Sequence, residues 1–409
     1  MAEVGPLEGL KVLDLSRVLA GPFCTMNLAD LGAEVIKIER PGVGDETREW
    51  GPPDQAGLAS YFLSINRNKR SVAIDLSSDQ GRELARRLAD KADVVIENFK
   101  IGGAAHLGLA YEDLRASNPG LIYCSISGFG SGREPSDRPG YDLIVQAESG
   151  LMSITGSPDG PPQRIGVALV DVLTGQQAAI GILSALHARD RTGEGQRIEV
   201  SLLDTSIASL VNIAQTALAT GEDPPRIGPA HPSIVPYQLF EASDGHLLVA
   251  AGNDAAFRRL CEVMELDSLP DDERFISNPD RVTHRDELIP ILSKRFSERG
   301  VTEWLADLEE AKIPCGKVRG VHDAISAAAS AGDPVTVGVE MDLPDGGTER
   351  IELIRQPLRF VSDPIDTDVS PPPRLGEHTA EVLAGELGLE AAEISDLEDA
   401  GVIECGPGA

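Results

Sequence analysis

The sequence has few cysteines, no long uninterrupted apolar run and no secretory signal. Its five cysteines stand far apart, at positions 24, 124, 261, 315 and 405. This scattered, odd set fits neither a disulfide framework nor the ligand spacing of a metal site. No apolar stretch approaches the roughly twenty residues of a membrane helix, and the acidic N-terminus contains Pro6 and Gly9, unlike a secretory signal. We therefore expect a cytoplasmic chain with no metal and no membrane span.

Positive charge is also scarce. Lysine and arginine number 36 against 66 acidic residues, which gives a net charge of −30, and only 8 of the 36 are lysines. A composition this acidic argues against nucleic acid as a partner, because phosphate binding needs a basic surface. Two explanations stay open. A salt-rich cytoplasm would screen the self-repulsion, whereas a GC-rich genome would explain the low lysine content but less of the net charge.

The length of 409 residues exceeds one ordinary hydrophobic core and predicts two domains. Buried-strand patterns alternate with helical patterns, which is typical of a mostly parallel sheet with helices on both faces. We expect an α/β fold, with a Rossmann-like parallel-sheet large domain and a smaller α+β domain. The expected strands are residues 11–15, 33–39, 71–76, 93–97 and 121–127, and the expected helices are residues 79–92, 174–189 and 202–220.

Helix-breaking residues at 221–225 indicate a domain boundary. We expect a large domain over residues 1–221, a linker over 222–235 and a small domain over 236–328. The small domain opens with a hairpin pattern whose turn is Asp244-Gly245. Residues 329–409, with a second hairpin turn at Asp345 and a terminal helix, should return to the large domain.

Polar residues follow or end several strand candidates, namely Arg17, Arg40, Asn98 and Ser127. Ligands of parallel sheets bind beyond the carboxyl ends of the strands, so these residues predict a shared crevice. No glycine-rich dinucleotide fingerprint follows the first strand, and we expect no nicotinamide cofactor.

Asp171 is a lone carboxylate that ends an apolar run and precedes a helical pattern extending through Ala185. Two interpretations follow from the residues alone. The carboxylate is either a helix N-cap or a reactive group held in a dry pocket.

The chain resembles the class III CoA-transferases. The similar segments occur in family order over nearly the whole chain, at residues 6–23, 28–42, 66–71, 94–99, 140–142, 166–183 and 374–379. Further segments resemble the succinyl-CoA:dicarboxylate branch, at residues 231–238, 244–245, 252–253 and 281–285. The resemblance implies that succinyl-CoA and a dicarboxylic acid are the substrates, that no resident cofactor is needed, and that two chains form an interlocked homodimer.

The resemblance also assigns site residues, with Asp171 as the catalytic nucleophile that forms aspartyl anhydride and thioester intermediates. It places CoA at Arg17, Ala20, Arg40, Lys69, Asn98 and Phe99, and the acyl pocket at Tyr141 and Asp142. Gly252 and Asn253 correspond to a glycine-rich loop that closes over the site, although an ordinary turn is an equal alternative because only one glycine remains. His231, Arg281 and Arg285 are candidate partners of the distal carboxylate of the acceptor.

Mesaconate is the first choice of acceptor if the host is halophilic, and glutarate, malate, itaconate and citramalate are also compatible. A first alternative function is α-methylacyl-CoA racemisation, which needs a base on each side of the α-carbon. Tyr141 stands where the racemases have histidine, and tyrosine, with a pKa of about 10, is a poor base at neutral pH. Asp142 keeps this alternative open as a second base. A second alternative is a non-catalytic CoA-ester-binding scaffold, against which the intact Asp171 speaks.

Overall fold

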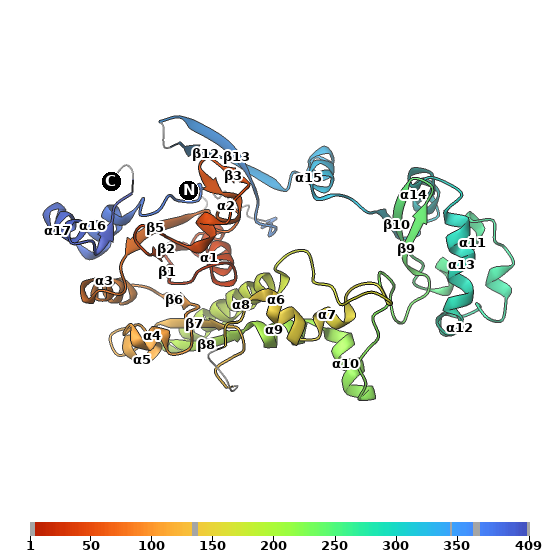
Figure 1. Ribbon diagram of the computed structural model, residues 1–409, viewed down its shortest axis with the longest axis horizontal. Coiled ribbons are helices and arrows are strands. Elements are labelled where there is room, and N and C mark those ends of the chain that lie inside the picture. The colour runs from red at the N-terminus through yellow and green to blue at the C-terminus, as the bar shows by residue number, and fades with distance from the viewer. Residues whose placement is uncertain (1–4, 133–137, 344–345, 363–368, 407–409) are drawn as a thin grey trace. The chain divides into compact units, whose positions relative to one another are not determined.

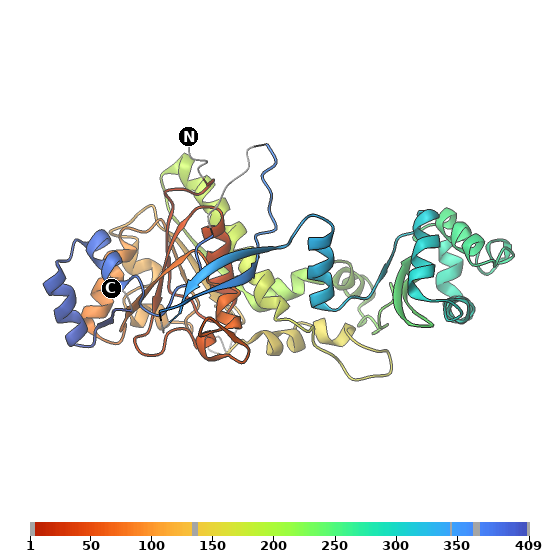
Figure 2. The same cartoon turned by 90° about the horizontal axis from the view of Figure 1, so that it is seen from above.

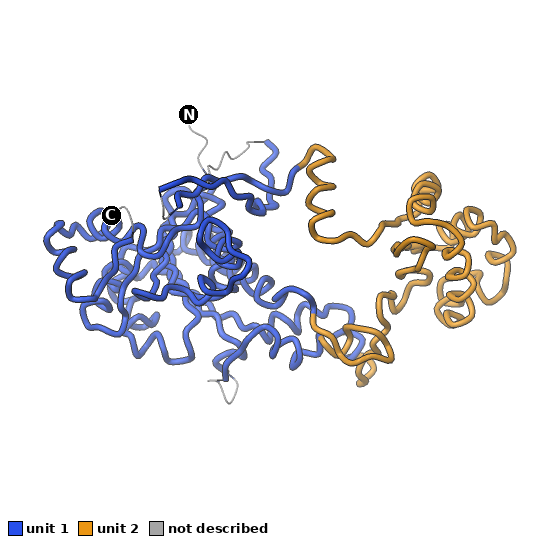
Figure 3. The backbone as a smooth tube through the Cα atoms, turned by 45° about the horizontal axis from the view of Figure 1, so that its top comes forward, with its two compact units in different colours: residues 1–151, 165–218, 334–409 blue, residues 152–164, 219–333 orange. Residues whose placement is uncertain are grey.

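The structure is a computed structural model that describes residues 5–132, 138–343, 346–362 and 369–406. The chain forms two compact units, coloured separately in Figure 3. Unit 1 comprises residues 1–151, 165–218 and 334–409, and unit 2 comprises residues 152–164 and 219–333. Unit 2 thus includes a short segment, residues 152–164, that the sequence boundaries assigned to the large domain.

Unit 1 is built on a seven-stranded sheet, which confirms the predicted mixed α/β fold with a parallel core. Six strands are parallel, and the short strand β14 joins one edge antiparallel to β5. The expected strands are all present, whereas the edge strand β8 was missed because its alternating charged residues do not read as a buried run. The strand order is β14 (Ile403–Glu404), β5 (Lys69–Ile74), β2 (Glu34–Glu39), β1 (Lys11–Asp14), β6 (Val94–Glu97), β7 (Ile122–Ser127), β8 (Gln196–Ser201).

The strand order reverses direction at β1, which pairs with β2 on one side and β6 on the other. From this point the chain builds outward through β2 and β5 in one direction, and through β6, β7 and β8 in the other. The loops that leave β1 and β6 therefore diverge at the carboxyl edge of the sheet and leave a crevice between them. Arg17 and Asn98 lie on these two loops.

Helices cover both faces of the sheet (Figures 1 and 2). Helices α1 (Ala20–Asp30) and α8 (Leu169–Thr192) pack on one face, where Cys24, Leu28 and Ile182 join the strand residues in one hydrophobic cluster. The other face carries α3 (Asp79–Ala89), α16 (Thr379–Leu387) and α17 (Ala391–Asp399). The two C-terminal helices complete this second layer, so the last part of the chain belongs to the core of unit 1.

By length and composition, α8 is apolar enough to cross a membrane, with a mean hydropathy of 1.4 in its best 18-residue window. The expectation that no stretch approaches such a length was wrong on this measure. In the structure, Ala178, Ile182 and Ala185 on α8 pack into the hydrophobic cluster on the sheet, and a buried core helix passes the same test. The expected helix 202–220 passes it only as a bent pair, because it breaks by 81° into α9 (Leu202–Ser209) and α10 (Val211–Thr220).

Unit 2 has its own hydrophobic core around Trp304, Phe296 and Phe257. Its antiparallel sheet contains the hairpin predicted at Asp244-Gly245, formed by β9 (Tyr237–Ala242) and β10 (Gly245–Ala250) and extended by β11 (Cys315–Lys317). The helices of this unit are α11 (Asp254–Val263), η2 (Leu269–Asp271), α12 (Asn278–Thr283), α13 (Arg285–Phe296), α14 (Val301–Glu310) and α15 (Val321–Ser330).

The remaining elements are short or lie at the margin of unit 1. The second predicted hairpin is present as β12 (Thr336–Asp342) and β13 (Thr348–Ile354), although Asp345 itself lies outside the described residues. The others are η1 (Glu46–Glu49), β3 (Asp54–Gln55), β4 (Leu58–Ala59), α2 (Ser60–Leu63), α4 (Gly103–His106), α5 (Tyr111–Leu114), α6 (Asp142–Glu148) and α7 (Leu151–Ile154).

Candidate active site

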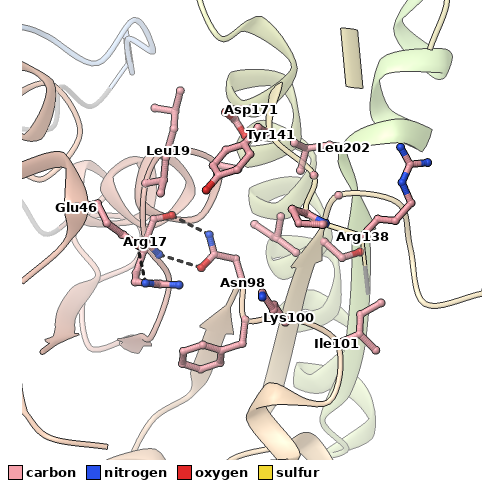
Figure 4. Close-up of a pocket in the computed structure, with 18 residues that line it drawn as sticks. Arg17, Leu19, Glu46, Asn98, Lys100, Ile101, Arg138, Tyr141, Asp171 and Leu202 are labelled. Carbon is pink, nitrogen blue, oxygen red and sulfur yellow. Dashed lines mark hydrogen bonds and ion pairs between the residues drawn. The ribbon is translucent and has the colours of Figure 1, made fainter. Parts of the chain in front are cut away.

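A cleft opens in unit 1 at the carboxyl edge of the sheet, where the strand order reverses (Figure 4). It spans about 980 Å³ of space not filled by protein atoms, part of which is open solvent. Seven residues placed at this site from the sequence line it together, although they come from separate segments of the chain: Arg17, Ala20, Asn98, Phe99, Ser127, Tyr141 and Asp171.

Asn98 joins the two loops that form this edge of the cleft. Its Oδ1 accepts a hydrogen bond from the Arg17 backbone N–H at 2.9 Å, and its Nδ2 donates to the Arg17 carbonyl at 2.7 Å. Both backbone groups of Arg17 are therefore held, while its guanidinium group is left to reach the cleft. Asn98 thus positions the Arg17 loop, in addition to any contact with a ligand.

The buried ion pair of Lys37 and Asp45 also holds the loop that carries Arg17. The Lys37 ammonium lies 3.0 Å from Asp45 and donates to the Ser16 carbonyl at 2.8 Å. Asp45 in turn accepts from the backbone N–H of Val18, whose φ of 70° is unusual for a β-branched residue. Burial opposes ionisation of Asp45, but Lys37 and the hydrogen bonds from Thr47 lower the pKa of Asp45 to about 2. The charged pair therefore stabilises the strained turn at Val18.

Asp171 lies in the first turn of α8, but it is not the helix cap. Ala168 occupies the N-cap position and makes no side-chain cap bond. Instead Asp142, from α6, accepts through Oδ2 from the backbone N–H groups of Val170 at 2.8 Å and Asp171 at 3.3 Å. The cap interpretation of Asp171 was thus wrong, because a residue distant in sequence caps the helix. Within the described part of the chain, no group donates a hydrogen bond to the Asp171 carboxylate.

The Asp171 carboxyl group is unusually easy to protonate. Burial raises the pKa of Asp171 to about 7, and the negative charge of Asp142 raises it further. Asp142 is buried and is held by a 2.5 Å hydrogen bond from Gln146. A carboxylate with a pKa near neutrality is a stronger nucleophile and base than an ordinary aspartate, and it remains substantially ionised at pH 7.

Tyr61, from α2, is a neighbour of this carboxylate that the sequence did not reveal. Burial raises the pKa of Tyr61 to about 12, with Asp171 and Asp142 as the next causes. Its ring packs edge-on against Trp50 with 5.0 Å between centroids. The phenol therefore stays protonated at physiological pH. Tyr61 lies in none of the segments that carry the resemblance, so no sequence signal pointed to it.

Two residues assigned to CoA lie outside the cleft. Lys69 is buried, and its ammonium contacts the Pro22 carbonyl at 2.8 Å, Asn66 Oδ1 at 2.9 Å and Asp14 at 3.3 Å. Burial lowers the pKa of Lys69 to about 8 against the opposing effect of Asp14. Its contacts stabilise the start of α1, and they give no support to a direct phosphate contact. Arg40 is exposed after β2 and does not line the cleft.

Two cations that the sequence reading missed line the cleft instead. Lys100 directly follows the Asn98-Phe99 motif, and among the described residues it forms no ion pair. Arg138 pairs with Glu148 and stacks over the Phe129 ring at 4.3 Å. Both stand just outside the segments that carried the resemblance, and only the fold brings them to the site.

Tyr141 is 65% exposed and lines the cleft, whereas its neighbour Asp142 is turned into the protein interior. Gly252 and Asn253 belong to unit 2. Asn253 is the N-cap of α11, with its side chain accepting from the Ala256 N–H at 2.9 Å. A Cβ on Gly252 would meet nothing within 4 Å. These contacts favour a capping turn, and a closing role for this loop stays a prediction.

The candidates for the distal carboxylate prove to have structural contacts in unit 2. Arg281 is completely buried, pairs with Asp254 at 2.7 Å and donates to the Val235 carbonyl at 2.8 Å. Arg285 donates to the carbonyl of His231 at 2.6 Å. The two arginines thus fix the loop 231–235, and Arg281 is not available to a ligand. Over the residues that the structure describes, no group of three or more His, Cys, Asp or Glu could hold a metal ion.

The chain belongs to CoA-transferase family III, whose family model matches residues 7–379. It is 43% identical over 399 residues to succinyl-CoA:glutarate CoA-transferase of Mus musculus, which covers 98% of this chain and 90% of that protein. It is 39% identical over 404 residues to succinyl-CoA:mesaconate CoA-transferase of Haloarcula hispanica, covering 93% of this chain and 96% of that protein.

A solved structure supports the same grouping. The CaiB/BaiF family protein from Brucella suis superposes with a TM-score of 0.81 at 43% sequence identity, covering 94% of this chain and 100% of that one. The resemblance read from the sequence is confirmed, and the protein is a family III CoA-transferase.

Proposed function

We propose that this enzyme moves CoA from succinyl-CoA to a five-carbon dicarboxylate, with Asp171 as the nucleophile. The observation that carries the proposal is the environment of Asp171. Its carboxyl group lines the cleft and has no hydrogen-bond donor among the described residues, and its pKa is raised to about 7. Strongly shifted pKa values cluster at functional sites, and a carboxylate with a purely structural role would instead be solvated or hydrogen-bonded.

In the proposed reaction, an Asp171 oxygen attacks the thioester carbon of succinyl-CoA and the carbon–sulfur bond breaks. This step gives a mixed anhydride and CoA thiolate. The thiolate attacks the aspartyl carbonyl, which releases succinate and leaves an aspartyl-CoA thioester. The incoming carboxylate then repeats the two steps in reverse, leaves as its CoA ester and restores Asp171. The chemistry needs no resident metal or redox cofactor.

The cleft suits a polyanionic thioester despite the net charge of −30. Arg17, Lys100 and Arg138 line it. Arg17 and Arg138 are paired with Glu46 and Glu148, so the uncompensated positive charge comes from Lys100, which forms no ion pair among the described residues. We propose that these three, together with Asn98 and Phe99, contact CoA. Arg40 and Lys69 are second choices, because the structure places neither of them on the cleft wall.

Similarity shifts the expected acceptor. The succinyl-CoA:glutarate CoA-transferase of mouse shares 43% identity with this chain, and the succinyl-CoA:mesaconate CoA-transferase of Haloarcula hispanica shares 39%. We therefore propose glutarate as the first acceptor to test. Mesaconate is the second candidate. The mesaconate relative comes from Haloarcula hispanica, and the highly acidic composition of this chain fits a salt-rich cytoplasm.

The decisive experiment is an acceptor screen. Succinyl-CoA is incubated with glutarate, mesaconate, malate, itaconate and citramalate in low and molar salt, and the CoA esters are separated by chromatography. We expect transfer to one or two acids and a loss of at least about 10⁴-fold in Asp171→Ala, since the covalent route is removed. Hydroxylamine would attack the activated aspartyl carbonyl and release CoA, so peptide mass spectrometry should find Asp171 as its hydroxamate.

Two outcomes would redirect the assignment. Exchange of the α-proton of a 2-methylacyl-CoA, without transfer to any acid, would establish the racemase alternative. Binding of CoA esters with neither transfer nor trapping would leave a non-catalytic scaffold.

A further inference from the structure

A carboxylate stands in the cleft beside the proposed CoA site, where an anionic substrate would be repelled. Glu46, the first residue of η1, lines the cleft and lies 2.6 Å from the guanidinium of Arg17. Both side chains are about half exposed, so the pair faces the space that the substrate would enter, as Figure 4 shows. Arg17 is thus neutralised in the free enzyme.

The carboxylate of Glu46 is poorly accommodated in this position. Its Oε1 contacts Arg17, but its Oε2 is buried without a hydrogen-bond partner among the described residues. A buried and unpaired carboxylate oxygen is destabilising. The Arg17 backbone is held on both sides by Asn98, so the guanidinium can change partners without moving the loop. Moving the Glu46 side chain out of the ion pair therefore costs little free energy.

We propose that Glu46 is a built-in competitor that occupies Arg17 in the free enzyme and is displaced by an anionic group of the bound substrate. The displaced carboxylate turns to solvent, and the substrate anion takes its place on the guanidinium. The anion is either a phosphate of CoA or the distal carboxylate of the acid. This inference rests on the proposed function, and it makes Glu46 a residue that weakens binding and so speeds product release.

The test is calorimetric titration of the full-length protein with CoA. We expect Glu46→Gln to bind CoA about threefold to tenfold more tightly than wild type, because a competing ion pair of ordinary strength is removed. Glu49→Gln is the matched control, since it removes the same charge from the same short helix without a contact to Arg17. In an Arg17→Gln background, Glu46→Gln should give no gain.

Two further titrations identify the anion. A gain with CoA that vanishes with pantetheine, which has no phosphate, assigns Arg17 to a CoA phosphate. A gain with glutarate alone assigns it to the distal carboxylate. If wild type binds CoA, but Glu46→Gln binds neither CoA nor glutarate more tightly than Glu49→Gln does, this inference alone is overturned. Failure of wild type to bind CoA would overturn the proposed function as well.

Discussion

At the scale of single residues, the buried environment of Asp171, which we propose makes it reactive, also destabilises the fold. Because burial raises the pKa of Asp171 from 3.8 to about 7, the folded protein keeps a proton that the unfolded chain loses between these pH values. This contribution to stability is present below about pH 4 and is lost as the pH rises through about 7. Asp171→Asn should therefore be inactive yet more stable than wild type at pH 8, by at most roughly 4 kcal/mol.

Denaturant unfolding at pH 4 and pH 8 measures this difference. The variant and wild type should differ by less than about 1 kcal/mol at pH 4, where the folded carboxyl group is protonated and the unfolded one, with a pKa of 3.8, is only about half ionised, and they should diverge at pH 8. Equal stabilities at pH 8 would show that Asp171 is not electrostatically strained in the fold.

Asp142 should set the pH at which the nucleophile becomes active. Its negative charge is the second cause of the raised pKa of Asp171, so Asp142→Asn should lower the pKa of Asp171. The rise of kcat/KM with pH, expected near 7 in wild type, should then move to lower pH. The amide oxygen can still accept from the Val170 N–H, whereas Asp142→Ala should lose the cap and about 1 kcal/mol of stability. An unchanged pH profile in Asp142→Asn would assign the raised pKa to burial alone.

The sequence identified Asp171 and the cleft residues Arg17, Asn98 and Phe99, because each lies in a recognisable local segment. It did not identify the partner of each charge. Lys69 looks like a phosphate ligand in sequence, but it is buried against Asp14. Asp142 looks like an acyl-pocket residue, yet it caps a helix that begins 27 residues later. Such pairings depend on tertiary distance, which no local pattern contains.

At the scale of elements, the contact between α1 and α8 holds the helix that carries Asp171 beside the cleft. Gly175 permits this contact, because a Cβ at this position would lie 2.5 Å from the Ala20 carbonyl oxygen and 3.3 Å from the Cys24 nitrogen. Both are backbone atoms, so they can move only if α1 moves. Gly175→Ala should therefore destabilise the protein by about 1–3 kcal/mol, despite the higher helix propensity of alanine. It should also raise KM for succinyl-CoA, since Ala20 lines the cleft.

Gly181→Ala, in the same helix, is the control. A Cβ there would meet only the Ile198 side chain, at 3.2 Å, which can rotate, so the change should stay within about 1 kcal/mol. Thermal unfolding and initial-rate kinetics of both variants test the comparison. Similar behaviour of the two variants would mean that helix propensity outweighs the α1 contact.

The strands of the sheet were predictable because buried parallel strands are continuous apolar runs. The helix breaks were less predictable. Residues 202–220 have one helical pattern, but Val211 adopts a φ of 41° and divides it into α9 and α10. No glycine or proline marks this break, so its cause lies in packing beyond the local sequence.

At the scale of the whole molecule, some helices are apolar but unburied. In α10 no residue is buried, and Val211 and Leu218 are 70% and 79% exposed. We propose that a second copy of the chain covers this surface, as the family resemblance implies. Leu218→Glu should then shift the protein from dimer toward monomer and reduce transferase activity, measured by light scattering and by the acceptor assay. Gln215→Glu is the control, because it adds a charge to the same helix without removing apolar surface. A wild-type protein that is monomeric in solution would refute the proposal.

The antiparallel strand β14 has a consequence for how the chain is made. It covers the edge of β5 with residues 403 and 404, while β1 at the centre of the same sheet begins at residue 11. During synthesis, unit 2 can emerge from the ribosome and fold before unit 1 has its last strand and its α16–α17 layer. A chain released early would present the open edge of β5 to other molecules. A chain that lacks β14 therefore differs from the full chain by an exposed strand edge. Proteases and chaperones would recognise the truncated chain by that edge.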